Sequence, residues 1–227
     1  RGEAMMHPQI FEFSKYAKDQ GVLDIHLTTN GTLFLKKGKI EELFNSGIDK
    51  LIFSLDDAHD ESIKEIYKKK KPDVGKYFNE IGEIKLKKNL KKPFLVAQTF
   101  CDKDENRLKV KKELSKIYQH ANDINVNLLW ESLPDKESLK DLKYRYEYLP
   151  CAYLWSRILV YWDGLVTTCC RDYSGENLTL GDANTDSIKN LWNSNKMNTF
   201  RKIHLENNRE KLKICANCEI STLKVAK

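Results

Sequence analysis

Four cysteines in the last third of the chain constrain its fold more than any other feature of the sequence. They read Cys-x12-Gly-x4-Cys and, 45 residues later, Cys-x2-Cys. A short Cys-x2-Cys lets one turn present two sulfurs to one centre, and a second pair arriving from a hairpin completes four ligands. Such a set holds either zinc or an iron–sulfur cluster. The sequence therefore predicts a four-thiolate metal site made by Cys151, Cys169, Cys215 and Cys218.

The bulk composition of the 227 residues fits one full domain with a small appendage. An apolar content of 41% is enough for a hydrophobic core. No run approaches 18 apolar residues, so we expect no membrane span, and no signal peptide is recognisable. We therefore expect a cytoplasmic protein whose six cysteines are thiols and metal ligands rather than disulfides.

The net charge of +6 comes mostly from lysine-rich segments such as residues 68–71 and 85–92. Basic patches can bind nucleic acid. In this chain the lysines alternate with Ile, Leu and Tyr at helical spacing, and no nucleic-acid-binding motif accompanies them. Solvated helix faces are the better interpretation, and we expect no nucleic-acid partner.

The first two thirds of the chain alternate between helical and strand patterns. Helices are expected at residues 7–20, 40–44, 60–67, 74–88 and 108–119. Strands are expected at residues 22–27, 50–55, 94–100 and 126–130. Alternation at this spacing indicates βα units around a parallel sheet.

The pattern changes near Pro150. Two β runs, residues 158–162 and 165–169, are joined by Asp-Gly, which is a strong hairpin signal. Two short helices are expected at residues 188–192 and 197–205. We therefore predict an α/β domain over residues 1–149 and a metal-binding domain over residues 150–227.

The remaining cysteines and histidines are expected to have structural roles. Cys170 neighbours Cys169 on a strand and should face the other side as a buried thiol. Cys101 is interpreted as a strand-end thiol without a ligand role. Among the histidines, His26 is expected to be a core residue with a satisfied hydrogen bond, and His204 to lie on the surface.

Four stretches together resemble a known family. Residues 2–8, Gly-Glu-Ala-Met-Met-His-Pro, are similar to a GGEP loop, and residues 28–31, Thr-Thr-Asn-Gly, to a TNG motif. Residues 47–56 resemble a fourth strand that ends in Ser-x-Asp. The cysteine pattern, with residues 181–192 inside it, is similar to an auxiliary-cluster domain. In this order, the stretches resemble radical S-adenosylmethionine (AdoMet) enzymes with a C-terminal SPASM or twitch domain.

The resemblance implies a fold. It would be a partial (β/α)6 TIM-like barrel followed by a small metal-binding domain made of a β-hairpin and helices. In α/β sheets, ligands bind at the carboxyl ends of the strands, and the three N-terminal motifs fall there.

The resemblance also assigns cofactor contacts. It implies that Gly2 and Glu3 contact the methionyl amino group of AdoMet, and that Ser54 and Asp56 bind the ribose hydroxyls. Two further polar residues complete the candidate set, Asn30 as a pocket wall and Gln98 as a polar contact at the end of its strand.

The sequence departs from the family in one important respect. The defining Cys-x3-Cys-x2-Cys, which would hold the catalytic [4Fe–4S] cluster, is not among these residues and belongs upstream of residue 1. Arg1 and Ala4 also replace a Gly and a Pro of the GGEP pattern. We expect the natural protein to be longer and to carry a second [4Fe–4S] cluster on the preceding segment.

Two functions follow as hypotheses. The first is a radical AdoMet enzyme that cleaves AdoMet reductively and oxidises or modifies a peptide or a small polar substrate, such as a sugar or aminocyclitol. Its auxiliary [4Fe–4S] cluster would transfer electrons, and an external one-electron donor of the flavodoxin or ferredoxin type would supply them. The alternative is a non-catalytic module whose four cysteines hold zinc or iron–sulfur and which recognises a partner. The cysteine spacing alone leaves both metals open.

Overall fold

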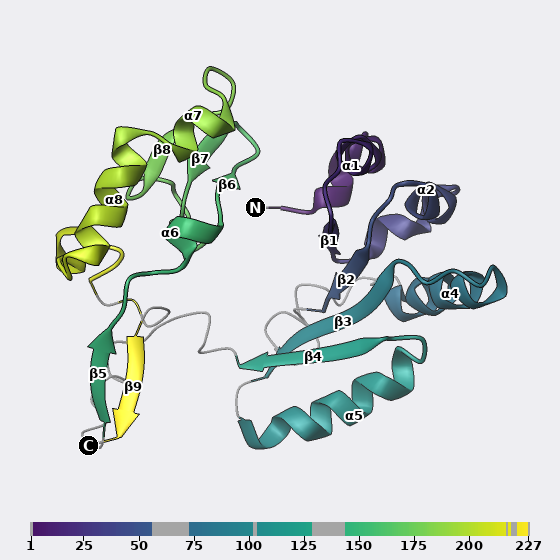
Figure 1. The fold of residues 1–227 in the computed structure, drawn as a ribbon. Helices are drawn as coiled ribbons and strands as arrows, with labels where there is room; N and C mark the ends of the chain where they lie inside the picture. The colour runs from purple at the N-terminus through teal and green to yellow at the C-terminus, as the bar shows by residue number, and fades with distance from the viewer. Residues whose placement is uncertain are drawn as a thin grey trace. The chain divides into compact units, whose positions relative to one another are not determined.

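The structure is a computed structural model, and it describes residues 2–55, 73–101, 104–128, 144–216, 218 and 222–226 (Figure 1). The chain divides into two compact units, a first unit over Gly2–Leu133 and a second unit over Pro134–Lys227. The helix expected at residues 60–67 and the candidate residue Asp56 lie outside the described residues.

The first unit is an α/β structure built on one parallel sheet, in which the strands follow their order along the chain. Its strands are β1 (His26–Thr29), β2 (Lys50–Ser54), β3 (Phe94–Cys101) and β4 (Asp123–Leu128). Its helices are α1 (Ile10–Asp19), α2 (Lys39–Asn45), α4 (Val74–Lys87) and α5 (Arg107–Ile117), with short 3-10 turns η1 (Ala4–Met6), η2 (Thr32–Leu35) and η3 (Asp104–Asn106). The predicted α/β class is confirmed, and over the described residues the sheet is open rather than a closed barrel.

Two strands of the first unit begin at a different residue than expected from the sequence. The first strand begins at His26, not at residue 22, because Val22 and Leu23 lie exposed in the loop after α1. The last begins at Asp123, where pairing with Val96 sets its start. His26 is exposed and contacts Asp24 at 2.7 Å, so its predicted place in the core was wrong.

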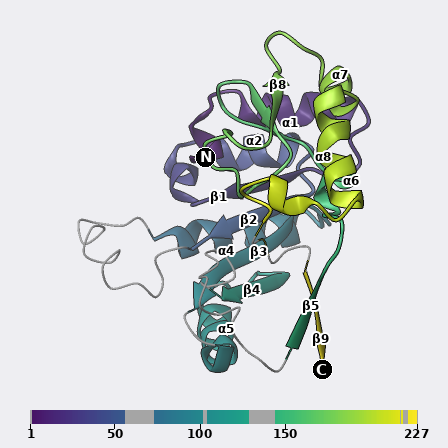
Figure 2. The same cartoon turned by 90° about the vertical axis from the view of Figure 1, so that its left-hand side faces the viewer.

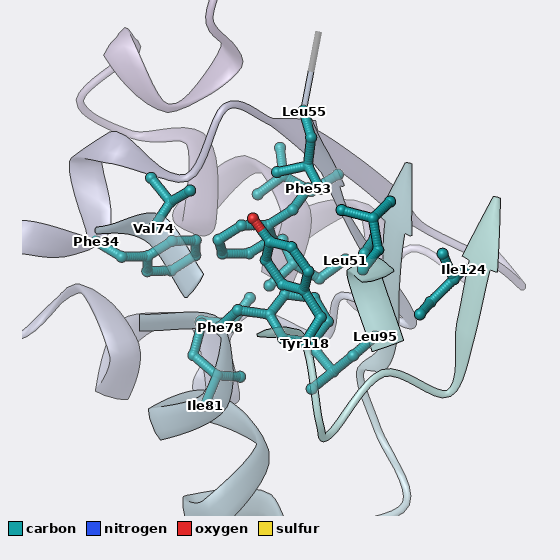
Figure 3. Close-up of a cluster of buried hydrophobic side chains, with 14 of the residues drawn as sticks. Phe34, Leu51, Phe53, Leu55, Val74, Phe78, Ile81, Leu95, Tyr118 and Ile124 are labelled. Carbon is teal, nitrogen blue, oxygen red and sulfur yellow. The ribbon is translucent and has the colours of Figure 1, made fainter. Parts of the chain in front are cut away.

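The two faces of the sheet differ in burial. Leu51, Phe53, Leu95 and Ala97 are fully buried in the core, together with side chains of all four helices. Phe53 stacks on Phe34 at 5.6 Å between ring centroids (Figure 3). Because strand side chains alternate between faces, residues such as Ser54 lie on the opposite, less buried face.

Gly31 ends the predicted TNG motif for a steric reason. Its φ of +78° lies in the left-handed region, which favours glycine. A Cβ at this position would also lie 2.3 Å from Cε1 of Phe53. The loop after β1 therefore packs directly on the aromatic core.

A buried carboxylate ties the amino ends of the strands together. Asp49 is 5% exposed and accepts hydrogen bonds from Lys18 Nζ at 2.7 Å and from the Ile25 amide at 2.9 Å. Lys92 Nζ also donates to it. The hydrogen bonds from Lys18 and then Lys92 hold the pKa of Asp49 well below its usual range.

We predict that Asp49→Asn costs about 1–3 kcal/mol of unfolding free energy at pH 7, because charge-assisted bonds are lost in a buried place. A lowered folded-state pKa means that this stability is present above the unfolded-state value near 3.8 and is lost as the pH falls below it. Urea unfolding at pH 7 and pH 3 should therefore show a smaller acid loss in the variant. The control is Asp19→Asn, which removes an exposed pair with Lys15; equal losses in both variants would contradict the assignment.

The second unit contains two small antiparallel sheets. One is formed by β6 (Leu159–Val160), β7 (Leu165–Thr167) and β8 (Thr179–Asp182), and the other by β5 (Tyr144–Tyr148) and β9 (Thr222–Ala226). The hairpin expected around Asp163-Gly164 is present as β6 and β7, whereas β8 and the pairing of β5 with β9 were not predicted. Because β5 pairs with β9, it belongs to the second unit, and the expected boundary near residue 149 falls after it.

Two helices of the second unit, α7 and α8, begin at serine caps. α7 (Ile188–Trp192) starts after Ser187, which accepts from the Asn190 amide, and α8 (Asn195–Leu205) starts after Ser194, which accepts from the Met197 amide. α8 contacts the short α6 (Tyr153–Ser156) (Figures 1 and 2), and a last 3-10 turn, η6, covers Arg209–Lys211. Over the described residues, no helix combines the length and the apolar character needed to cross a bilayer.

Candidate metal centre and cofactor pocket

All four predicted ligands line one pocket in the second unit. The other residues that line it are Tyr153, Leu154, Thr168, Arg171, Leu178, His204 and Ile214. No cysteine of the chain forms a disulfide, so the four thiols are available to a metal.

Separate local structures bring each thiol to the pocket. Cys151 precedes α6, and its carbonyl accepts from the Leu154 amide. Cys169 follows the end of β7. Cys215 and Cys218 share one turn, in which the Cys218 amide donates to the Cys215 carbonyl at 3.2 Å. Cys215 and Cys218 share a turn as predicted, whereas Cys151 comes from the segment before α6 rather than from the hairpin.

Asp172 fixes the loop that carries Cys169. Its side chain is 1% exposed and accepts from Thr167 Oγ1, the Asn177 amide and the Leu178 amide. A buried carboxylate with this many donors holds the chain from β7 to β8 in one conformation. Asp172 was not among the residues predicted from the sequence.

Burial and mutual repulsion act on the thiols. Burial raises the pKa of Cys151, Cys169 and Cys215, that of Cys215 to about 12. After burial, the pKa of Cys215 is raised further by the neighbouring charges of Cys169, Cys218 and Cys151. Metal binding requires the deprotonated thiolates, and these repel one another. A bound metal cation would offset that repulsion.

The spacing of the thiols bears on the kind of metal. Within the described parts of the chain, no three His, Cys, Asp or Glu side chains converge closely enough to hold a single metal ion. A zinc ion needs all its sulfurs about 2.3 Å from one point, whereas a cluster offers a separate iron to each thiolate. The pocket lined by the four thiols offers one such ligand to each iron of a [4Fe–4S] cluster.

A buried cation accompanies the four thiols. Arg209 is 4% exposed, and its Nη2 donates to the Cys218 carbonyl. Its charge opposes the rise in the pKa of Cys151 and Cys215. The guanidinium therefore stabilises negative charge in the pocket.

The two remaining cysteines, Cys170 and Cys101, are not among the residues that line this pocket. Cys170 lies in a turn, because β7 ends at Thr167, and it is half-buried with Arg157 Nη1 at 3.9 Å. The prediction of a fully buried thiol on the opposite face of a strand was wrong. Cys101 is buried at the end of β3 in the first unit, as expected.

His204 was predicted to be a surface residue, and the structure contradicts this. It is 4% exposed and lines the pocket of the four cysteines. Its Nδ1 accepts from the Cys151 amide at 3.3 Å, and burial lowers its pKa. The sequence did carry a signal, since Met197, Phe200 and His204 recur at intervals of three and four and form the buried face of α8.

In the first unit, Glu3 joins two of the predicted motifs. Its Oε1 accepts from the Met5 amide at 2.9 Å and from Thr29 Oγ1 at 2.7 Å. Its Oε2 accepts from the Asn30 amide at 2.7 Å. The carboxylate therefore fastens the loop of Gly2 and Glu3 to the end of β1.

The parallel register places the other candidates in a row. Ser54 pairs with Gln98, and Gln98 pairs with Asn125 on the next strand. Asn30 follows Thr29, the partner of Phe53, and so continues the row beyond β1. Paired residues share a face, so these side chains form one polar row on the sheet, at the end of β2 and within β3 and β4. Asn125 was missed because only the register reveals it.

One known family model matches the part of the second unit that carries the four cysteines. Residues 151–219 match the family model of SPASM, an iron–sulfur cluster-binding domain. The C-terminal part of this chain is therefore similar to a SPASM domain, in agreement with the resemblance seen in the sequence.

Two solved structures resemble the chain as a whole. They are BtrN in complex with AdoMet and 2-DOIA and selenomethionine BtrN in an open conformation. Each has 16% sequence identity and a TM-score of 0.52. The matches cover 96% and 97% of this chain and 69% and 70% of the BtrN chains. The chain therefore shares the fold of BtrN, while no curated protein sequence matches it.

We predict that changing Cys151, Cys169, Cys215 or Cys218 singly to Ser lowers bound iron to below half and lowers the melting temperature of the second unit, because we expect each thiolate to be a ligand. Iron per chain and thermal unfolding after anaerobic reconstitution measure both effects. Cys170→Ser is the matched control and should keep its iron. Iron loss in that variant, with retention in Cys169→Ser, would show that the ligand set is wrong.

We predict that Glu3→Gln destabilises the first unit by about 1–3 kcal/mol, since an amide nitrogen cannot accept the bonds that the second carboxylate oxygen accepts. Denaturant unfolding measures the change. Glu12→Gln, at an exposed position of α1, is the control and should cost less than about 0.5 kcal/mol. Equal stability of the two variants would remove the structural role of Glu3.

Proposed function

We propose that this chain is the core of a radical AdoMet enzyme whose SPASM domain holds an auxiliary [4Fe–4S] cluster on Cys151, Cys169, Cys215 and Cys218. The observation that carries the proposal is the convergence of these four thiols on one pocket inside a matched SPASM domain. The BtrN complex with AdoMet, which shares the fold, supports AdoMet as the cofactor of the first unit.

The polar row on the sheet would bind AdoMet. Ser54 and Gln98 lie side by side on one face, where a hydroxyl and an amide can hydrogen-bond ribose hydroxyls. Glu3 would act by holding the loop of Gly2 against Asn30. Asp56 joins this set from the sequence resemblance alone.

When bound next to a reduced [4Fe–4S] cluster, AdoMet supplies methionine and a 5′-deoxyadenosyl radical, which abstracts hydrogen from a substrate. The Cys-x3-Cys-x2-Cys motif for that cluster is not among these 227 residues, so the reaction belongs to a polypeptide that also supplies this motif. The residues described above then position the cofactor, and the cofactor supplies the reactive species.

The auxiliary site would serve electron transfer. Four protein thiolates fill the coordination of a [4Fe–4S] cluster and leave no iron open to a substrate. The chemistry would then be an oxidation or modification of a peptide or a small polar compound, such as a sugar or aminocyclitol. A flavodoxin- or ferredoxin-type protein would be the external one-electron donor.

The test is AdoMet cleavage by the polypeptide encoded by the complete gene, reconstituted anaerobically with iron and sulfide. With dithionite, we expect 5′-deoxyadenosine, measured by liquid chromatography and mass spectrometry. Ser54→Ala and Gln98→Ala should each weaken AdoMet binding about five- to tenfold, as expected for one lost hydrogen bond. Ser115→Ala on α5 is the control and should bind normally.

The contrary result is equally clear. Iron-loaded protein that binds no AdoMet and forms no 5′-deoxyadenosine would refute the enzyme proposal. Purified protein that retains zinc and accepts no cluster would make the non-catalytic metal-binding module the better account.

A further inference from the structure

Two polar atoms in the pocket of the four cysteines are buried without a partner. Thr168 is fully buried and His204 is 4% exposed. Thr168 Oγ1 and His204 Nε2 have no hydrogen-bond partner among the described residues. Leaving such a group unsatisfied costs about 1–3 kcal/mol, so each calls for an explanation.

The hydrogen bond at His204 Nδ1 determines whether Nε2 of the same ring is a donor or an acceptor. Nδ1 accepts from the Cys151 amide, so in the neutral imidazole the proton is on Nε2. That nitrogen is then a donor, and the Thr168 hydroxyl can also donate. The pocket therefore contains two buried donors that lack acceptors.

The pocket also has a source of acceptors. Both residues line it together with the four thiols, and Thr168 directly precedes Cys169. The Arg171 amide already donates to Cys169 Sγ at 3.4 Å, so sulfur acts as an acceptor at this site. Thiolate and sulfide sulfurs are the anionic acceptors that an iron–sulfur cluster would bring here.

We propose that Thr168 and His204 donate hydrogen bonds to the sulfur atoms of the auxiliary cluster and thereby raise its reduction potential. The inference rests on the proposed function, because it requires an iron–sulfur cluster in this pocket. Reduction adds one negative charge to the cluster, and donors stabilise the more negative state more strongly. The two residues are thus positioning and tuning residues rather than ligands.

A water molecule is the competing explanation. The cavity volume is ≈ 20 Å³, which is enough for about one water. A water would satisfy the same two donors without any effect on a cluster. The reduction potential distinguishes the two explanations, because only donors that reach the cluster change it.

The experiment uses two matched pairs of variants in the reconstituted full-length protein. His204→Asn keeps an oxygen near the position of Nδ1 but removes the donor at Nε2, whereas His204→Gln places an amide donor near Nε2. Thr168→Val removes the hydroxyl at constant shape, and Thr168→Ser keeps it. The auxiliary-cluster potential is measured by a redox titration followed by electron paramagnetic resonance.

At a fixed solution potential, we expect His204→Asn and Thr168→Val each to lower the ratio of reduced to oxidised auxiliary cluster about tenfold, or ~59 mV for one electron. His204→Gln and Thr168→Ser should restore most of the wild-type ratio. If a variant at one of the two positions loses its cluster, the pair of variants at the other position still tests the proposal. Equal potentials in cluster-loaded Thr168→Val, His204→Asn and wild type would overturn the inference and leave the proposed function intact. A wild-type protein that assembles no cluster would instead refute both.

Discussion

The convergence of four cysteine thiols on one pocket is the constraint on which the second unit depends. Its strands are short, and Cys215 itself belongs to its hydrophobic core. Burial raises the pKa of three of the thiols, so the apo site opposes the ionised form that a metal requires. Arg209 partly offsets this, and Asp172 keeps the loop of Cys169 in place. A bound cluster would therefore contribute to folding as well as to electron transfer.

The first unit depends on a different constraint, the register of its parallel strands. Register decides that Ser54, Gln98 and Asn125 share one row, while Phe53 and Ala97 turn to the helices. At the opposite end of β2, Asp49 is buried between lysines and the Ile25 amide. On β2, Ser54 of this polar row and the buried Asp49 thus lie at opposite ends of the strand. This separation leaves the carboxyl ends for a ligand, as is general in α/β sheets.

Much of the fold and site could be predicted from local patterns. The α/β alternation, the hairpin at Asp163-Gly164 and the four cysteines at one pocket followed from periodicity, turn chemistry and ligand spacing. The failures concern properties that depend on distant residues. The start of β4 is set by pairing with β3, and β5 finds its partner β9 far along the chain. His204 shares a helix face with Met197 and Phe200, so its burial had a local signal, but the hydrogen bond that it accepts from the Cys151 amide, 53 residues away, had none.

The sequence by itself determined which residues are the candidates for the chemistry of this protein. Thiolates at metal-binding spacing and polar residues at strand ends are local patterns, which can be recognised without knowledge of the packing. Only the tertiary structure decided which neighbours surround them: the buried donors of Thr168 and His204, the guanidinium of Arg209 and the row completed by Asn125. The physical reason is that burial and pairing join residues far apart in the chain, and a local pattern contains no information on such contacts.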